Sequence, residues 1–427
     1  MPIEPVLLTK IKQLSQQLQP ELVCLRRGLH QQPELSGQEE QTANTLINAL
    51  QVCGVQVERC LSGFGFAALV HGREPGRVAA LRVDIDALPI QETNQHTFVS
   101  QRPGVMHACG HDLHSAIGVG VAKVLASLRD QFEGTVLIIF QAEEEEITGA
   151  LKIIRSGLLD HPKPEALFGL HVCPLPAGKL GYREGLFLSG FEHYLVKLRD
   201  QQKGDDLARL ELVAESCCQA INALNTLDLP QDEQEEAATW QGMLDGRPEL
   251  QDFVVYAAST AEEDEPEYRG QLGLGIKASS RALRRAAKKT VKETLDEVCH
   301  PLQVNFVMRE MGSMPDVIND RQLVRQSLPA LRAVISEEDF LEIKAGYPFN
   351  CEDFAFYLKH LPGAMFWLGA ANPERGMHAR LHTSNFDVDE GCITVGVRAM
   401  SAVLLDVLSK PSKKVQAGIQ AVCYSAK

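Results

Sequence analysis

Short apolar runs alternate with amphipathic segments along the first part of the chain. Runs that are rich in β-branched residues and bounded by turn residues predict strands at 66–72, 78–86, 135–143 and 165–172. Segments with helical periodicity predict helices at 20–32, 39–54, 115–131 and 149–159. Strands that alternate with helices favour an α/β fold with a mixed, mostly parallel sheet covered by helices.

From about Leu186 the pattern changes. It predicts strands at 191–200, 250–260, 271–279 and 302–310, helices at 208–227 and 281–300, and a polar connection at 229–250. Strand, helix, two strands, helix, strand is the order of a small α+β, ferredoxin-like domain. We therefore predict a catalytic α/β domain at 1–185 and 313–410, an inserted α+β lid at 186–312, and a poorly ordered C-terminal tail at 411–427.

Composition narrows the class of protein. The length of 427 residues predicts two domains, and 44% hydrophobic with 23% charged residues is a normal globular balance. A net charge of −14 argues against nucleic acid or an anionic membrane as partner and fits small molecules or metal cations. We expect no secretory signal and no apolar run of the roughly 18 residues that a membrane helix needs. Eleven cysteines without a CxxC pair indicate reduced thiols in the cytoplasm.

Ionisable residues gather where the predicted strands end. The acidic run Glu143–Glu146 follows one strand directly, and Asp84 and Asp86 end another. Carboxylates that alternate along a regular strand point to opposite faces, so at most one of this pair would face the cluster. The segment MHACGHDLH at 106–114 holds a thiol and imidazoles, which suit zinc, manganese or similar ions. Because ligands collect beyond the carboxyl ends of strands in such sheets, these positions indicate a functional site.

Seven segments resemble the M20 metallopeptidase family in its own order, and most closely its amidohydrolase branch of hippurate hydrolases, N-acyl-amino-acid deacylases and plant auxin-conjugate hydrolases. The segments are LRRGLHQQPELSGQEEQTA, LRVDIDALPIQE, MHACGHDLHSA, FQAEEEEITGA, GLHVCPLPAGKLG, CEDFAFYLKHLPGAMFWLG and LHTSNFDVDE. The resemblance implies a di-metal amidohydrolase that acts on a small N-acyl amino acid or related conjugate.

The resemblance also implies roles for particular residues. Two divalent ions (manganese, zinc, cobalt or nickel) would be held by Cys109, His111, Glu145, His171 and His382. Glu144 would be the general base, Asp86 the carboxylate that supports the metal site, and Asp112 and His114 residues that contact the ligands. Family members do not require a carboxylate at Glu143 or Glu146, for which extra solvated charge and a supporting role are about equally favoured.

The inserted domain departs from the family pattern. Relatives carry a glycine-rich turn with a histidine, broadly GKGGHA, where this chain has VKLRDQQKGDDLARLEL. His193 and Arg281 are candidates for a substitute contact to substrate, although strand pairing and a solvated helix face explain them more simply. The family's homodimer contact through this domain is left open, as are a non-catalytic metal-binding homologue and a dipeptidase or carboxypeptidase.

Overall fold

The computed structural model describes residues 3–60, 62–200, 206–260 and 270–410. The predicted tail at 411–427 lies outside them. The chain forms two compact units: Met1–Gly185 with Asn319–Glu342 and Phe356–Lys427, and Leu186–Ile318 with Ile343–Ala355.

The predicted lid boundary at 312 differs from this division. Strand β11 (Val304–Met314) continues past that position. The segment 343–355 also joins the second unit through main-chain bonds, because Tyr347 N–H donates to Phe187 O (2.9 Å) and Lys344 N–H to Met243 O (2.9 Å). These contacts join residues far apart in the chain, and the local pattern of the sequence does not show them.

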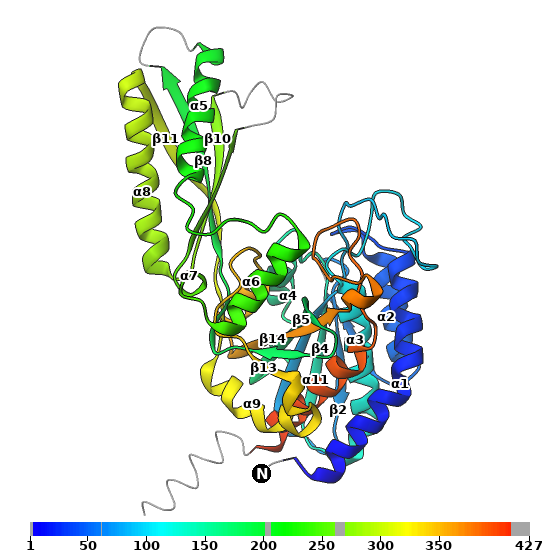
Figure 1. Ribbon diagram of the computed structural model, residues 1–427. Helices are drawn as coiled ribbons and strands as arrows, with labels where there is room; N and C mark the ends of the chain where they lie inside the picture. The colour runs from blue at the N-terminus through cyan, green and yellow to red at the C-terminus, as the bar shows by residue number, and fades with distance from the viewer. Residues whose placement is uncertain (1–2, 61, 201–205, 261–269, 411–427) are drawn as a thin grey trace, which may run out of the picture. The chain divides into compact units, whose positions relative to one another are not determined.

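The first unit is built on an eight-stranded mixed sheet (Figure 1). Its strands, in spatial order, are β1 (Gln56–Arg59), β2 (Phe66–His71), β4 (Thr135–Gln141), β3 (Val78–Asp84), β5 (Ala166–Pro176), β14 (Gly363–Ala371), β6 (Leu180–Tyr182) and β13 (Phe340–Glu342). The central strands β4, β3, β5 and β14 run parallel, and β1, β2 and β6 pair antiparallel with a neighbour. The predicted mostly parallel α/β fold is confirmed.

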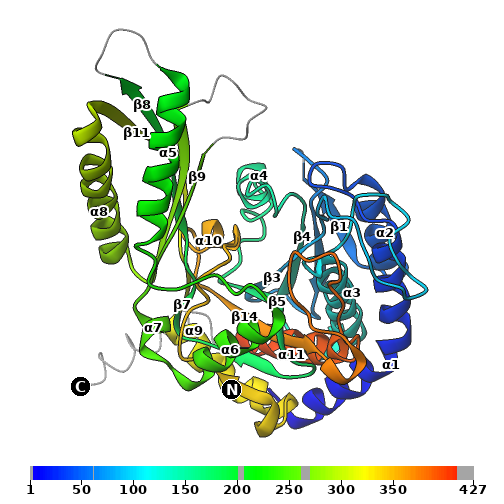
Figure 2. The same cartoon turned by 45° about the horizontal axis from the view of Figure 1, so that its top comes forward.

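Helices pack on this sheet (Figure 2). They are α1 (Pro5–Gln31), α2 (Glu40–Gln51), α3 (His111–Ser127), α4 (Gly149–Ser156), α9 (Arg321–Val334) and α11 (Cys392–Ser409), and the short α10 (Phe354–Tyr357) spans the boundary between the units. α1, α3 and α11 contact one another, and α3 and α11 both contact β3. The prediction had α1 begin at residue 20, but the helix starts at Pro5 and carries Pro20 inside it.

Helix α11 bears on the expectation that the chain holds no membrane helix. Its 18 residues have a mean hydropathy of 1.7, so by length and composition alone it could cross a membrane. However, 83% of that stretch is buried inside the first unit. Such burial is typical of a core helix, which passes the same test of length and hydropathy.

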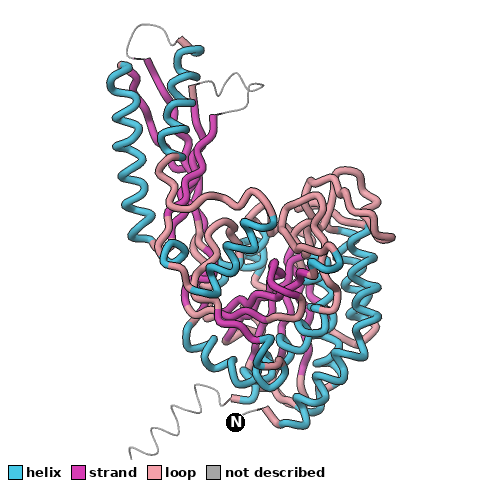
Figure 3. The backbone as a smooth tube through the Cα atoms, viewed as in Figure 1, coloured by secondary structure: helices cyan, strands magenta, loops and turns pink. Residues whose placement is uncertain are grey.

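The second unit holds a four-stranded antiparallel sheet, which Figure 3 shows with its two long helices. The spatial order is β11, β8 (Phe191–Asp200), β10 (Gln271–Ala278) and β9 (Val254–Thr260). Helices α5 (Leu207–Asn222) and α8 (Arg281–Cys299) contact each other and the sheet. The short strands β7 (Gly185–Leu188) and β12 (Val317–Asn319) pair separately. Between the predicted strands at 250–260 and 271–279 the sequence predicts an acidic turn, AEEDEPEYRG. Except for Gly270 it lies outside the described residues, as do residues 201–205 of the altered glycine-rich turn.

The polar connection predicted at 229–250 is wrong, because this segment forms α6 (Glu233–Asp245) and α7 (Pro248–Gln251). The Asp232 side chain caps α6 by accepting bonds from the backbone of Gln234 and Glu235, both 2.9 Å. Trp240 is buried and its ring stacks on Tyr347, with centroids 5.2 Å apart. The buried face of α6 is narrow, so most of its residues are polar. The sequence of this segment therefore lacks the apolar periodicity that predicts a helix.

Candidate metal centre

The carboxyl ends of neighbouring parallel strands meet at one edge of the large sheet. β3 ends at Asp84 and β4 at Gln141, and β5, which lies on the other side of β3, carries His171. The segments that follow β3 and β4 bring Asp86 and the acidic run to the same place. This is the position at which parallel sheets bind ligands.

Cys109 and His111 come from the turn that begins α3. Gly110 between them has φ 78°, and a Cβ there would lie 2.6 Å from a side-chain methyl group of β5. Only glycine fits this turn without a shift of its neighbours. His382 enters from a loop far along the chain, where its N–H donates to the carbonyl of Ala108 (2.9 Å).

The five predicted metal ligands lie together. Their donor atoms form two groups that share Cys109, one with His111 and His171 and the other with Glu145 and His382, and in each group the atoms lie within 4.8 Å of one another. Cys109 Sγ is 3.5 Å from His171 Nε2 and 3.3 Å from His382 Nε2. Glu145 Oε1 is 3.4 Å from His382 Nε2 and 3.8 Å from His111 Nε2.

In each of two buried histidines, one ring nitrogen bonds the backbone and the other faces this cluster. His171 Nδ1 lies 2.8 Å from the carbonyl of Val172, and His111 Nδ1 lies 3.0 Å from the carbonyl of Asp86. A carbonyl only accepts, so each Nδ1 carries a proton. The Nε2 of His171 keeps a lone pair, and the Nε2 of His111 would present one to an ion that replaced its proton. Within the described part of the chain, His111 Nε2 and Glu145 Oε1 are buried without a hydrogen bond.

The carboxylates around His111 stabilise a positive charge at this position. Burial lowers the pKa of His111, but the charges of Asp84, Asp86 and Glu145 outweigh it and raise the pKa to about 10. Burial, reinforced by neighbouring histidines, holds the pKa of His171 well below its usual value, so His171 is a neutral ligand. One thiolate, three imidazoles and a carboxylate are the donors that zinc and similar ions prefer. The residues present therefore fit divalent metal ions.

The carboxylates of Asp84 and Asp86 both face the cluster, which corrects the expectation that at most one would. β3 ends at Asp84, so the alternation of a regular strand does not extend to Asp86. Asp86 Oδ1 lies 3.2 Å from His111 Nδ1, and its Oδ2 accepts from Glu145 N–H (3.0 Å). Asp84 Oδ1 lies 2.6 Å from His114 Nδ1 and 3.8 Å from His111 Nε2. The sequence reasoning assigned no role to Asp84, although its spacing from Asp86 was the available signal.

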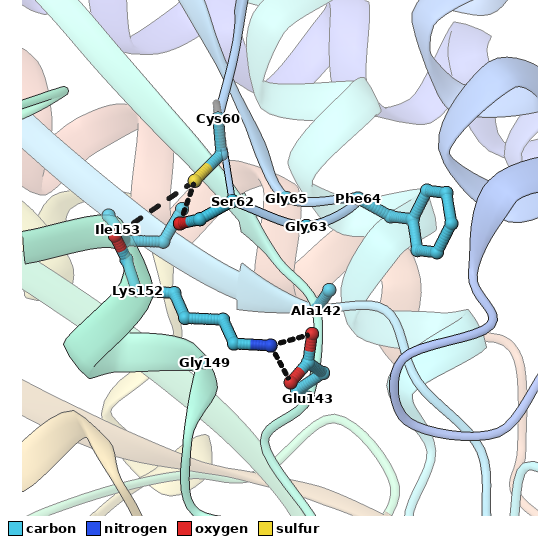
Figure 4. Close-up of a pocket in the computed structure, with 10 residues that line it drawn as sticks. All are labelled: Cys60, Ser62, Gly63, Phe64, Gly65, Ala142, Glu143, Gly149, Lys152 and Ile153. Atoms are coloured by element: carbon cyan, nitrogen blue, oxygen red, sulfur yellow. Dashed lines mark hydrogen bonds and ion pairs between the residues drawn. The ribbon is translucent and has the colours of Figure 1, made fainter. Parts of the chain in front are cut away.

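Glu143 is neither solvated nor directed at the donor atoms. Its carboxylate forms an ion pair with Lys152 of α4, with Nζ at 2.6 and 2.5 Å from the two oxygens (Figure 4). Its own N–H donates to Glu39 Oε1 (2.9 Å), and burial above all raises the pKa of Glu39 to about 7. The adjoining cavity of about 10 Å³ is lined by this ion pair and Cys60, and it has room for about one water molecule.

The other carboxylates of the run differ in environment. Glu144 is 7% exposed and lies with His111 and Glu145 in a group whose ligand atoms are within 4.8 Å of one another. Glu146 is exposed. Glu144 thus lies beside the metal donors, and Glu146 faces solvent.

The two residues predicted to contact the ligands have separate surroundings. His114 Nδ1 donates to Asp84, and its Nε2 accepts from Val172 N–H (3.0 Å), next to His171. Asp112 is fully buried against α1, where its Oδ2 lies 2.8 Å from both Arg26 Nε and His30 Nδ1. His114 therefore contacts the backbone beside a ligand, whereas Asp112 joins the centre to α1.

The candidate substrate contacts lie in the second unit. His193 is exposed on β8, opposite Gly275 of β10 and Gly312 of β11. Arg281 is the exposed first residue of α8, directly after the capping Ser280, whose side chain accepts from Leu283 N–H (3.2 Å). Their role toward substrate stays a prediction.

An α/β unit whose strand ends bring a thiol, imidazoles and carboxylates together has the features of a metal-binding enzyme. Residues 80–406 match the model of peptidase family M20/M25/M40. The chain therefore belongs to this family, and the prediction of an M20-type hydrolase is confirmed.

Known proteins similar to this chain agree with that family. It is 33% identical over 399 residues to "Probable hydrolase sll0100" of Synechocystis, covering 92% of this chain and 97% of that protein. It is 30% identical over 388 residues to N-acetyldiaminopimelate deacetylase of Priestia megaterium, covering 88% and 96%. A dinuclear metal-binding peptidase of the M20 family from Bacillus subtilis has a similar structure, with a TM-score of 0.71 at 25% identity over 93% of this chain and all of that one.

Proposed function

We propose that this chain is a metal-dependent amidohydrolase that cleaves the amide bond of N-acyl amino acids or related conjugates, with Glu144 as general base. The observation that carries the proposal is the convergence of five metal donors beside a buried glutamate that is not itself needed as a donor. The name of the Priestia relative, a deacetylase of an N-acetylated amino acid, supports the substrate class.

Cys109, His111, Glu145, His171 and His382 would hold two divalent ions. Such ions lower the pKa of a coordinated water to about 7 and polarise a carbonyl oxygen. Asp86 orients His111 through Nδ1 and holds Glu145 through its backbone, so both donors keep their direction. Glu144 lies next to these donors and would take a proton from the attacking water, then deliver it to the leaving nitrogen.

The test compares three neighbouring glutamates. Glu144→Gln should keep its metal ions and lose on the order of 10²–10⁴-fold in kcat on an N-acetyl amino acid. Glu145→Gln should lose metal, and the exposed Glu146→Gln should change neither property. Elemental analysis after reconstitution with manganese, zinc or cobalt gives the metal content of each variant.

Two outcomes would refute the assignment. Loss of metal in Glu144→Gln with retention in Glu145→Gln would show that the two roles are exchanged. A Cys109→Ser/His382→Ala variant that bound as many ions per chain as wild type would show that the metal centre lies elsewhere. If the wild type binds metal but hydrolyses none of a panel of N-acyl amino acids and dipeptides, the hydrolase proposal fails as a whole.

A further inference from the structure

A second group of metal-type donors lies in the first unit, between α1 and the loop that follows β3. It consists of His30, Glu92 and His96, whose ligand atoms lie within 4.8 Å of one another. None of these residues belongs to the centre described above. His30 is fully buried, and the side chains of Glu92 and His96 are 3% and 16% exposed.

The hydrogen bonds of His30 define which nitrogen could bind an ion. Nδ1 lies 2.8 Å from Asp112 Oδ2, closer than its 3.3 Å approach to Arg26 Nη2, so Nδ1 carries a proton and donates it to Asp112. Nε2 lies 3.2 Å from Glu92 Oε1 and donates to it while it carries a proton. A divalent ion in place of that proton would contact both atoms. Histidines that bind metals commonly donate their other N–H to a carboxylate in this way.

His96 completes the group. Its Nε2 lies 3.3 Å from the same Glu92 oxygen, yet both of its ring nitrogens are buried without a hydrogen bond within the described residues. Its ring stacks on Phe98 with centroids 3.8 Å apart, so packing holds its direction. The Glu92 carboxylate is itself held, because Oε2 accepts from Ser100 N–H (2.6 Å) and Oε1 from Asn94 Nδ2 (3.1 Å).

The two nitrogen–oxygen separations in this group match those of a tetrahedral site. Zinc–ligand distances of about 2.0–2.1 Å place neighbouring ligands of a tetrahedron roughly 3.3 Å apart. The two nitrogen–oxygen separations at Glu92 are 3.2 and 3.3 Å. We propose that His30 Nε2, His96 Nε2 and Glu92 Oε1 form an additional site for a zinc-class divalent ion, separate from the hydrolytic centre.

This site also has a consequence for the fold. His30 lies on α1, and Asp112 lies at the start of α3 beside His111. An ion at Glu92 would fasten the loop after β3 to α1 and, through Asp112, to the helix that carries a donor of the hydrolytic centre. The site is therefore expected to act on stability more than on the reaction.

The test counts metal ions in the full-length protein. Wild type, His96→Ala and His96→Gln are stripped with chelator, reconstituted with Zn²⁺ and desalted, and zinc per chain is measured by elemental analysis. We expect both His96 variants to hold about one equivalent less than wild type. The exposed His71 bonds Thr135 at 3.1 Å outside this group, so His71→Ala is the matched control and should bind as wild type does.

Reconstitution with Co²⁺ identifies which site has changed. The Cys109 thiolate gives a sulfur-to-cobalt charge-transfer band at the hydrolytic centre, and the group around Glu92 contains no sulfur. The band should persist in the His96 variants while the metal count falls. Equal zinc in wild type and both His96 variants would overturn the proposal and indicate that a protonated His30 satisfies Glu92. Loss of the band together with the metal would overturn it as well, because the change would then not be confined to this site.

Discussion

Asp86 contacts two of the proposed metal donors, His111 and Glu145, and holds their direction. Its Oδ2 accepts from Ser36 Oγ (2.7 Å) and from Glu145 N–H (3.0 Å), and its Oδ1 faces His111 Nδ1 at 3.2 Å. Burial raises the pKa of Asp86, but these bonds outweigh it and lower the pKa below its usual value. The residue is therefore ionised and only accepts hydrogen bonds.

The substitution Asp86→Asn keeps the shape and removes this property. An amide has one accepting oxygen and one donating NH₂ group. The oxygen would best face the two donors at the Oδ2 position, so the NH₂ group would face His111 Nδ1–H. The histidine would then lose a bond to a charged group, which is typically worth about 1.5–3 kcal/mol. Since 1.4 kcal/mol is about tenfold in affinity, we expect Zn²⁺ to bind about 10–100-fold more weakly.

Competition with a chromogenic chelator measures this change directly, and kcat at saturating Zn²⁺ separates metal loss from a loss of orientation. The matched control is Asp320→Asn, because Asp320 caps α9 by accepting from Leu323 N–H (2.7 Å) and asparagine caps helices equally well. Unchanged Zn²⁺ affinity in Asp86→Asn, with the fold intact by circular dichroism, would refute the reasoning. It would mean that His111 keeps its tautomer and direction without the carboxylate.

Three further predictions concern the turn at α3 and the second unit. Gly110→Ala should lower the free energy of unfolding by about 1–2 kcal/mol for the left-handed backbone and by about 1–3 kcal/mol for the clash, measured in urea, and should weaken metal binding; unchanged stability would show that the turn can relax. Burial lowers the pKa of Lys277 to about 8 from 10.5, so its folded form releases a proton first and stability should rise between pH 8 and 10.5. Urea titrations should show this slope in wild type and not in Lys277→Met, and equal slopes would contradict it. His193→Ala should lower kcat/KM if His193 contacts substrate, and Arg281→Ala should do so if Arg281 does. A variant with unchanged kcat/KM would remove its residue as a candidate.

The sequence revealed most of the sheet, and its failures have physical causes. Continuous apolar runs identified β2, β3, β4 and β5, because strands buried on both faces carry few polar residues. Helix α6 was missed because its stability comes from the contact of Trp240 with Tyr347, more than 100 residues away. Local periodicity cannot report such a contact.

The candidate site was predictable only in part, for a related reason. The types of donor and their positions after strands suggested metal chemistry, and the family resemblance chose five of them. The partners that orient these donors were less visible, since Arg26 and His30 contact Asp112 across more than 80 residues. Asp84 was passed over because a regular strand was assumed to continue beyond its actual end.

The acidic run itself shows how four adjacent carboxylates can coexist. In a regular strand or helix, neighbours of like charge would line one face or crowd one turn. Here Glu143 and Ile147 both have φ 58°, so the backbone reverses on each side of the segment between them. The reversal sends Glu143 to Lys152, brings Glu144 and Glu145 to the donor group, and leaves Glu146 in solvent. Each carboxylate thus has its own source of compensation. A residue in the left-handed conformation costs about 1–2 kcal/mol in general. Here the separation of the four like charges offsets that cost.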